Sequence, residues 1–293
     1  MSGRIHRFRV GALACTALYD GTFHYQAERY VANAAPEELQ PALDSHGLDP
    51  RSIPSPYTCL LVETAGRRVL LDTGGAGLDP ALGQLPTSLR AAGIAPEEID
   101  GVVLTHGHPD HIGGNADDEG RLSFPNARHV MAKAEWEFWN APEVLARVPE
   151  PFRRAATKNL PPIADRLDLT EGDTEVAPGI RILPTPGHTP GHVAVVLESE
   201  GEELLYISDA ALHPMHLEHP DWYPIFDIDP VRALDSKRML CERATRNGSL
   251  VLAFHFDPFP SLGHIVRTSR GWAWEPVASA PIDATGGPSA GRG

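Results

Sequence analysis

The sequence has little cysteine. Only three occur among 293 residues, and they lie far apart, at Cys15, Cys59 and Cys241. An odd number at such separations argues against a disulfide framework, and the absence of any CxxC pair argues against a cysteine metal site. Any metal chemistry in this chain must therefore come from nitrogen and oxygen ligands.

The sequence also lacks positive charge and long apolar runs. Acidic residues outnumber basic ones by 39 to 25, which leaves a net charge of −14 and no electrostatic basis for binding nucleic acid. The N-terminal stretch MSGRIHRFRV has no apolar core of a signal peptide, and no run reaches the length of a membrane helix. We therefore expect a cytoplasmic protein whose partner is a small-molecule substrate, with no nucleic acid and no membrane.

Short apolar runs alternate with segments of helical composition along most of the chain. Helices are expected over Asp79–Ala92, from residue 134 and over residues 230–247. The expected strands are 57–64, 67–74, 100–106, 127–133, three between 179 and 210, 249–255, and a closing hairpin over 263–277. This mixture, without a linker or repeat, predicts one α/β domain over residues 1–277. Residues 278–293, rich in Ala, Gly, Pro and Ser, are predicted to be a disordered tail.

The densest chemical signal is the stretch THGHPDHIGG, residues 105–114. It places three imidazoles and one carboxylate within six positions, at His106, His108, Asp110 and His111. The preceding residues read as a buried strand, and the glycines and proline mark a loop. Unpaired imidazoles cost free energy when they are desolvated, so packing alone gives a loop no reason to collect them. The stretch predicts a metal site.

Other candidate ligands also follow predicted strands, where loops from separate strands can converge. Histidines two residues apart in an extended loop can face one ion, whereas the residues after Pro109 can face a second. The predicted groups are His106, His108 and His188 for one ion, and Asp110, His111 and His255 for the other, with Asp209 able to bridge both. This donor set suits two divalent ions, with zinc expected first and iron, manganese or cobalt as alternatives.

The motif THGHPDH resembles the HxHxDH signature of the metallo-β-lactamase superfamily. His188 in PTPGHTPGH, Asp209 in YISDA and His255 follow in the family's order, and LLDTGG (70–75) resembles an early strand and turn of that family. The resemblance covers about residues 10–275. It implies a four-layered αββα sandwich with both metals at one edge, between the sheets. It also implies that Asp72 supports the metal loop by hydrogen bonding rather than by binding metal.

Three further stretches resemble the branch that contains methyl parathion hydrolase and acyl-homoserine lactonases; they are residues 17–25, 211–230 and 254–265. This branch implies a homodimeric binuclear hydrolase, in which a hydroxide shared by the metals attacks a lactone or ester carbonyl. Asp110 is the candidate catalytic residue that passes a proton to the leaving alkoxide. An organophosphate triester is the alternative substrate. A di-metal redox protein is the alternative from a different functional class.

The sequence indicates the substrate pocket less clearly than it indicates the metal ligands. Many acyl-homoserine lactonases carry a tyrosine three residues after the bridging aspartate, where this chain has Leu212. The candidate pocket residues are Leu212, His213, Trp139, Phe226 and His264. The aromatic ones could equally belong to the core, and the histidines could be ordinary polar residues. Residues 25–56 could form a lid over the metals, a surface excursion or a dimer contact.

Overall fold

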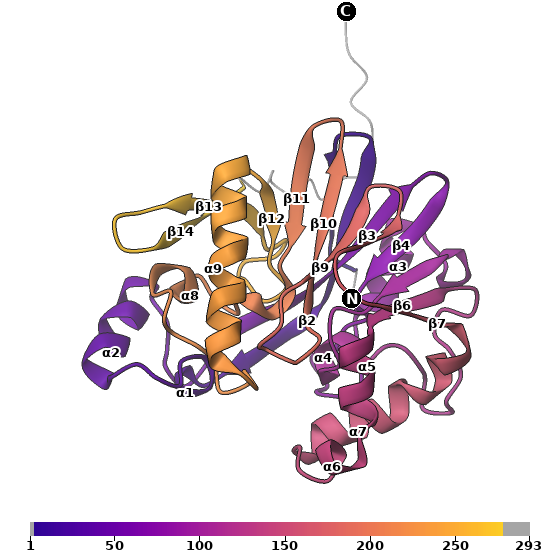
Figure 1. Cartoon of the computed structure of the whole chain (residues 1–293), viewed down its shortest axis with the longest axis horizontal. Helices are drawn as coiled ribbons and strands as arrows, with labels where there is room; N and C mark the ends of the chain where they lie inside the picture. Colours follow the sequence, from indigo (N-terminus) through magenta and orange to yellow (C-terminus); the bar gives the residue numbers. More distant parts are fainter. Residues whose placement is uncertain (1–2, 278–293) are drawn as a thin grey trace, which may run out of the picture.

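The structure, a computed structural model, describes residues 3–277 and contains two seven-stranded sheets packed face to face (Figure 1). The predicted tail, 278–293, lies outside the described residues. In spatial order, the first sheet contains β1 (Ile5–Val10), β2 (Leu13–Tyr25), β3 (Ile53–Thr64), β4 (Arg67–Leu71), β5 (Gly101–Val103), β6 (Arg128–Ala132) and β7 (Leu167–Thr170). The second contains β14 (Trp272–Pro276), β13 (Leu262–Arg267), β12 (Leu250–Leu252), β11 (Glu202–Tyr206), β10 (Val193–Ser199), β9 (Ile180–Pro184) and β8 (Thr174–Ala177).

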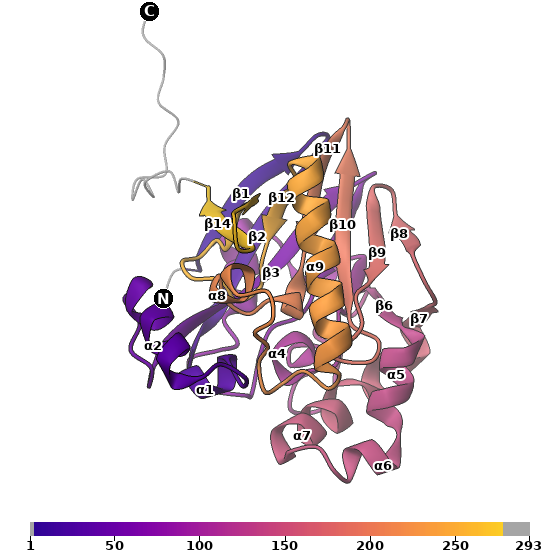
Figure 2. The same cartoon turned by 60° about the vertical axis from the view of Figure 1, so that its left-hand side comes forward.

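Helices complete the outer layers. The helices of the first half of the chain are α1 (Ala27–Tyr30), α2 (Pro36–Ser45), α3 (Leu85–Ala92), α4 (Pro109–Ile112), α5 (Lys133–Asn140), α6 (Pro142–Leu145) and α7 (Glu150–Asn159). Later come α8 (Met215–Glu218) and α9 (Pro230–Asn247), and short 3₁₀ turns occur at Pro96–Glu98, Pro161–Arg166 and Ser208–Ala210. Helix α3 packs against β1 and β2 of the first sheet. Helix α9 packs on the second sheet (Figure 2). The layers confirm the predicted αββα sandwich.

The core lies mainly between the sheets and follows from the strand sequences. Strand β3 is buried along almost its whole length, as are the central residues of β10 and β11. Leu60, Leu70, Val195 and Leu204 are fully buried and belong to one continuous cluster. Strands covered on both faces need near-continuous apolar runs rather than alternation, which is the pattern of these sequences.

Two predicted elements form for the reasons that the sequence indicates. The hairpin β3–β4 turns at Ala65 and Gly66, both with positive φ, as a tight two-residue hairpin requires. Helix α9 begins after Asp229, whose carboxylate accepts a hydrogen bond from the Arg232 N–H at 3.2 Å. It ends at Gly248, which adopts the left-handed conformation.

Several predicted boundaries differ from the structure, among them the strands expected over 67–74, 100–106 and 249–255, which are shorter. Two further differences have a clear physical cause. The helix expected over Asp79–Ala92 begins only at Leu85, because the buried Asp20 carboxylate accepts hydrogen bonds from the N–H groups of Gly83 and Leu85 and holds the preceding residues in a turn. The loop expected over residues 105–114 contains the short helix α4, which begins at Pro109. Proline at the first helical position suits this start, since its fixed φ is helical and its missing N–H would be unpaired there.

The fold gathers the candidate ligands at one edge of the sandwich. Helix α4 lies between α1 and α2 on one side and α5–α7 on the other in both views (Figures 1 and 2). Residues that follow β5, β9, β11 and β12 meet there, which brings ligands from both sheets together. None of the described helices has the length and apolar character needed to cross a membrane.

The cap of α9 allows a test of this packing. Asp229→Ala should lower the free energy of unfolding by about 1 kcal/mol, because the first turn loses its side-chain acceptor. Asp235→Ala, in the same helix, removes only a 4.0 Å ion pair with Arg238 and should change stability little. Urea unfolding of both variants checks the difference, and equal losses would contradict the assigned cap.

Candidate metal centre

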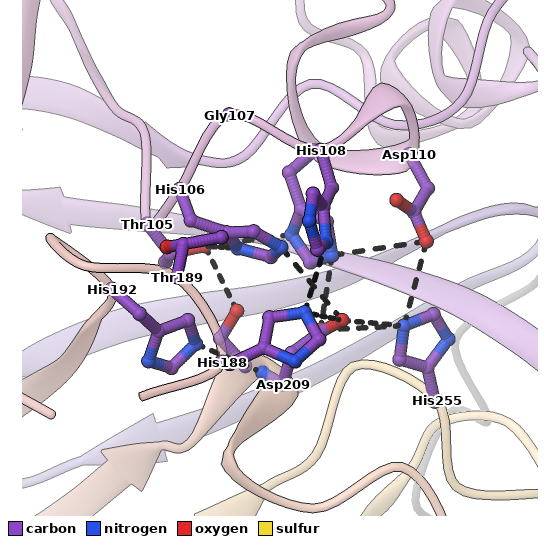
Figure 3. Close-up of polar contacts among 12 residues, drawn as sticks. Thr105, His106, Gly107, His108, Asp110, His188, Thr189, His192, Asp209 and His255 are labelled. Carbon is purple, nitrogen blue, oxygen red and sulfur yellow. Dashed lines mark hydrogen bonds and ion pairs between the residues drawn. The ribbon is translucent and has the colours of Figure 1, made fainter. Parts of the chain in front are cut away.

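The stretch after β5 presents its side chains from two local conformations. His108 is extended, with φ −71° and ψ 154°, and directly precedes α4. Asp110 and His111 lie within that helix. Because the chain changes from extended to helical at Pro109, the side chains of Asp110 and His111 point to a different position from those of the two preceding histidines. Figure 3 shows this difference for His106, His108 and Asp110. One hexapeptide can thus serve two positions.

The first group of possible ligands comprises His106, His108, His188 and Asp209, all buried. Its ligand atoms lie within 4.8 Å of one another. His188 Nε2 lies 2.9 Å from His108 Nδ1 and 3.2 Å from Asp209 Oδ2. The His106 Nε2 atom lies 3.8 Å from that same carboxylate oxygen. Three imidazoles and one carboxylate oxygen therefore face one small volume.

The second group comprises Asp110, His111, Asp209 and His255, also buried. His111 Nε2 lies 3.0 Å from Asp209 Oδ1, and His255 Nε2 lies 3.3 Å from it. Asp110 Oδ2 lies 3.5 Å from His255 Nε2. Asp209 thus belongs to both groups. Its Oδ2 is the oxygen near His106 and His188 (Figure 3). Its Oδ1 is the oxygen nearest His111.

The atoms facing these volumes fit metal ions. Within residues 3–277, His106 Nε2, His111 Nε2 and Asp209 Oδ1 are buried and make no hydrogen bond, although the last two lie 3.0 Å apart as an ion pair. A buried polar atom left unpaired costs about 1–3 kcal/mol, so three at one place indicate a missing partner. Burial lowers the pKa of His106 and of His108 well below the usual histidine range, which leaves neutral imidazoles. The two groups can hold two divalent metal ions.

Buried acceptors fix the rings of the second group. Asp72 Oδ2 lies 2.8 Å from His111 Nδ1, as the sequence resemblance implied. The same carboxylate accepts hydrogen bonds from the Thr105 backbone N–H at 2.8 Å and from the Tyr206 hydroxyl at 3.0 Å. His255 Nδ1 lies 2.9 Å from Ser55 Oγ. These contacts leave Nε2 of each imidazole directed at the site.

Two further contacts orient the remaining groups. Asp227 Oδ1 lies 2.8 Å from His188 Nδ1. His192 is not in either group: its Nε2 accepts a hydrogen bond from the Asp209 backbone N–H at 3.2 Å, and its Nδ1 lies 3.0 Å from the Thr185 carbonyl oxygen. The second histidine of PTPGHTPGH therefore holds the backbone of Asp209 in place. Sequence reasoning missed both roles, although the motif itself contained His192.

Comparison with known proteins agrees with this geometry. Residues 53–255 match the family described as the metallo-beta-lactamase superfamily. The chain belongs to the metallo-beta-lactamase superfamily. An N-acyl homoserine lactonase of Bacillus cereus is 28% identical over 221 residues, which are 68% of this chain and 81% of that protein. The superfamily assignment and these relatives establish a metal-dependent hydrolase.

Two solved structures are similar over almost the whole chain. AidC, a dizinc quorum-quenching lactonase in complex with a product, is 27% identical, with a TM-score of 0.86 over 95% of this chain and 99% of that one. The hydrolase AbOPH is 26% identical, with a TM-score of 0.88 over 96% of this chain and 99% of that one. The fold of this superfamily member is thus shared from end to end with hydrolases.

A cavity of about 510 Å³ opens onto the metal groups of this superfamily member. Its floor includes His108, Asp110, Asp209 and His255. The other lining residues are mostly apolar or aromatic; they are Phe23, Tyr25, Tyr30, Leu78, Pro109, Pro151, Phe152, Leu212 and Phe226, with His24, Gln26, Arg29 and Arg51 as the polar members. Five residues of the segment 25–56 supply part of the cavity wall; they are Tyr25, Gln26, Arg29, Tyr30 and Arg51.

The predicted pocket residues divide into two sets. Leu212 and Phe226 line the cavity, whereas Trp139, His213 and His264 do not. Trp139 is in the core behind His108, 5.6 Å away between ring centroids. His213 packs against other rings, and its Nδ1 accepts from the Met215 backbone N–H. The Nδ1 atom of His264 lies 3.0 Å from the carbonyl oxygen of Ser249, a residue that precedes β12. His264 is therefore near the start of β12, whereas His255 follows the end of that strand.

The shared carboxylate leads to a test by substitution. Asp209→Asn removes a charge that faces both groups, so we expect both metal equivalents to bind more weakly and turnover to fall by about 100-fold or more. Asp227→Asn touches only His188 and should weaken one equivalent. Elemental analysis after dialysis against a series of buffered zinc concentrations measures both. If Asp209→Asn retained two equivalents at the wild-type affinity, the shared role would be wrong.

Proposed function

We propose that this hydrolase opens the ring of a lactone of the N-acyl homoserine type, with two zinc ions held by the seven side chains described above. The observation that carries the proposal is a mostly apolar cavity whose floor includes four of those side chains, His108, Asp110, Asp209 and His255. A cavity of this volume suits a small organic substrate. The B. cereus relative and AidC, both lactonases, support the same substrate class.

The metals would supply the reactive oxygen. Bound by the seven side chains, two divalent ions would lower the pKa of water and polarise a carbonyl oxygen of the substrate. The protein supplies position: Leu212 and Phe226 can bury the acyl part of a substrate, which places its carbonyl at the cavity floor. No other role of the ions is needed to explain the shape of the site.

Asp110 is the proposed proton carrier. Its Oδ2 atom lies 3.5 Å from His255 Nε2 and 3.9 Å from His111 Nε2. Asp110 also lines the cavity. It is therefore placed to pass a proton to the alkoxide that leaves when the ring opens. The alkoxide of an opening lactone is more basic than the aryloxide of an aryl ester or aryl phosphate, so a lactone gains more from a proton donor at this place.

Substrate classes can be ranked on one metal-loaded sample. Leu212 offers no hydrogen bond to a substrate, and the walls are mostly apolar, so we expect broad tolerance of acyl chains. The values of kcat/KM should decrease from an N-acyl homoserine lactone to an aryl acetate to a diethyl aryl phosphate. A phosphotriester that exceeds the lactone by more than about tenfold, or about 1.4 kcal/mol in transition-state stabilisation, would replace the lactone as the assigned substrate.

The part of the cavity proposed to bury the acyl chain of the substrate can be tested separately. Phe226→Ala removes part of the apolar wall of the cavity. If about 40 Å² of contact with the substrate is lost, binding weakens by about 1 kcal/mol, which is about fivefold in KM. We expect this for a lactone with a ten-carbon chain and little change for a four-carbon one. Ile228→Ala is the control, because Ile228 is exposed and does not line the cavity. An equal effect on both chain lengths would contradict the placement of the acyl chain.

A further inference from the structure

Glu135 is a fully buried carboxylate in the first turn of α5, outside both metal groups. Its Oε1 accepts hydrogen bonds from the Gly107 backbone N–H at 2.8 Å and from the Trp139 indole N–H at 2.6 Å. Its Oε2 accepts from the Thr189 hydroxyl at 2.6 Å and from the Gly191 backbone N–H at 2.9 Å. Burying a charge without such partners is costly, so four donors on one carboxylate form a built site.

The donors belong to the two loops that carry the first group of histidines. Gly107 lies between His106 and His108 in the chain, and Thr189 directly follows His188. The close-up places Gly107 and Thr189 beside these imidazoles (Figure 3). One carboxylate thus joins two loops that are distant in sequence. Through Glu135, backbone and side-chain donors of both loops share one hydrogen-bond acceptor on α5.

The packing between α5 and these loops leaves no room for side chains. A Cβ atom on Gly107 would lie 2.2 Å from Trp139 Cδ1, and one on Gly191 would lie 2.2 Å from the Glu135 backbone N. Both glycines therefore allow the loop backbones to touch the helix. This contact explains why Trp139 belongs to the core: its indole fills the space behind Gly107 and donates to Glu135.

We propose that Glu135 is a positioning residue that sets the distance between the His106–His108 loop and the His188 loop, and so controls metal binding at the first group. The second group has other supports, since Asp72 and Ser55 hold His111 and His255. Removing Glu135 should therefore affect the two metal equivalents unequally. A carboxylate is required because all four partners donate; a glutamine would turn an NH₂ group toward two of them.

The test is a stepwise titration of metal-free protein with Co²⁺, followed by the visible absorption of the ion and by calorimetry. Glu135→Gln should weaken one of the two equivalents by about 10–100-fold and leave the other at its wild-type affinity. Glu203→Gln is the matched control. Glu203 also accepts from several donors, on Arg243, Ser249 and Asn247, but lies in β11 at the end opposite Asp209. Its variant should bind both equivalents normally.

Two outcomes would overturn the proposal: unchanged binding of both equivalents in folded Glu135→Gln, or equal weakening of both. Thr189→Val provides a second variant if Glu135→Gln does not fold. It removes a single donor and should weaken the same equivalent by a smaller factor, and no selective weakening would contradict the proposal. The inference rests on the proposed pair of metals but not on the substrate. A wild-type protein that binds two Co²⁺ ions and hydrolyses no lactone would refute only the substrate.

Discussion

The buried carboxylate of Asp209 is the contact on which this molecule depends, because it faces imidazoles from both metal groups. Burial alone would raise the pKa of Asp209, but His111 and His255 hold it well below its usual range. A negative charge can remain in such a place only with positive or hydrogen-bonding partners around it. The chain provides imidazoles from loops of both sheets as these partners. The imidazoles in turn need hydrogen-bond partners of their own, which other parts of the fold supply.

The fold meets this requirement by ending several strands at one edge. The ends of β5 and β11 lie in different sheets, and the Thr105 hydroxyl joins them through a 2.8 Å contact with the Ser208 hydroxyl. Ser208 itself has a positive φ of 47°, an uncommon backbone conformation for a serine, directly before Asp209. Rigid strands thus fix the loop ends, and short-range hydrogen bonds fix the side chains, so that few degrees of freedom remain when metal binds.

Sequence reasoning identified the two ligand groups, because four of the residues lie within one hexapeptide and the others end predicted strands. It could not identify Glu135, because three of its four partners lie 28 to 56 residues away and two of those three are backbone N–H groups without a sequence signature. In the stretch AEWEFW this glutamate resembles an exposed helix residue. Trp139 and His264 were assigned to the pocket wrongly for a related reason, since only tertiary packing decides which side of a loop or which end of a strand a side chain occupies.

The most direct test of the central claim is electron paramagnetic resonance of the protein loaded with two equivalents of Mn²⁺. If Asp209 carries one oxygen to each ion, the two ions should be exchange-coupled and give the closely spaced hyperfine pattern of a binuclear centre. The spectrum of Asp209→Ala should then show only uncoupled Mn²⁺, or the variant should fail to retain both ions. A wild-type spectrum of two independent Mn²⁺ ions, or saturation at a single equivalent, would contradict a shared carboxylate and the two-metal site built on it.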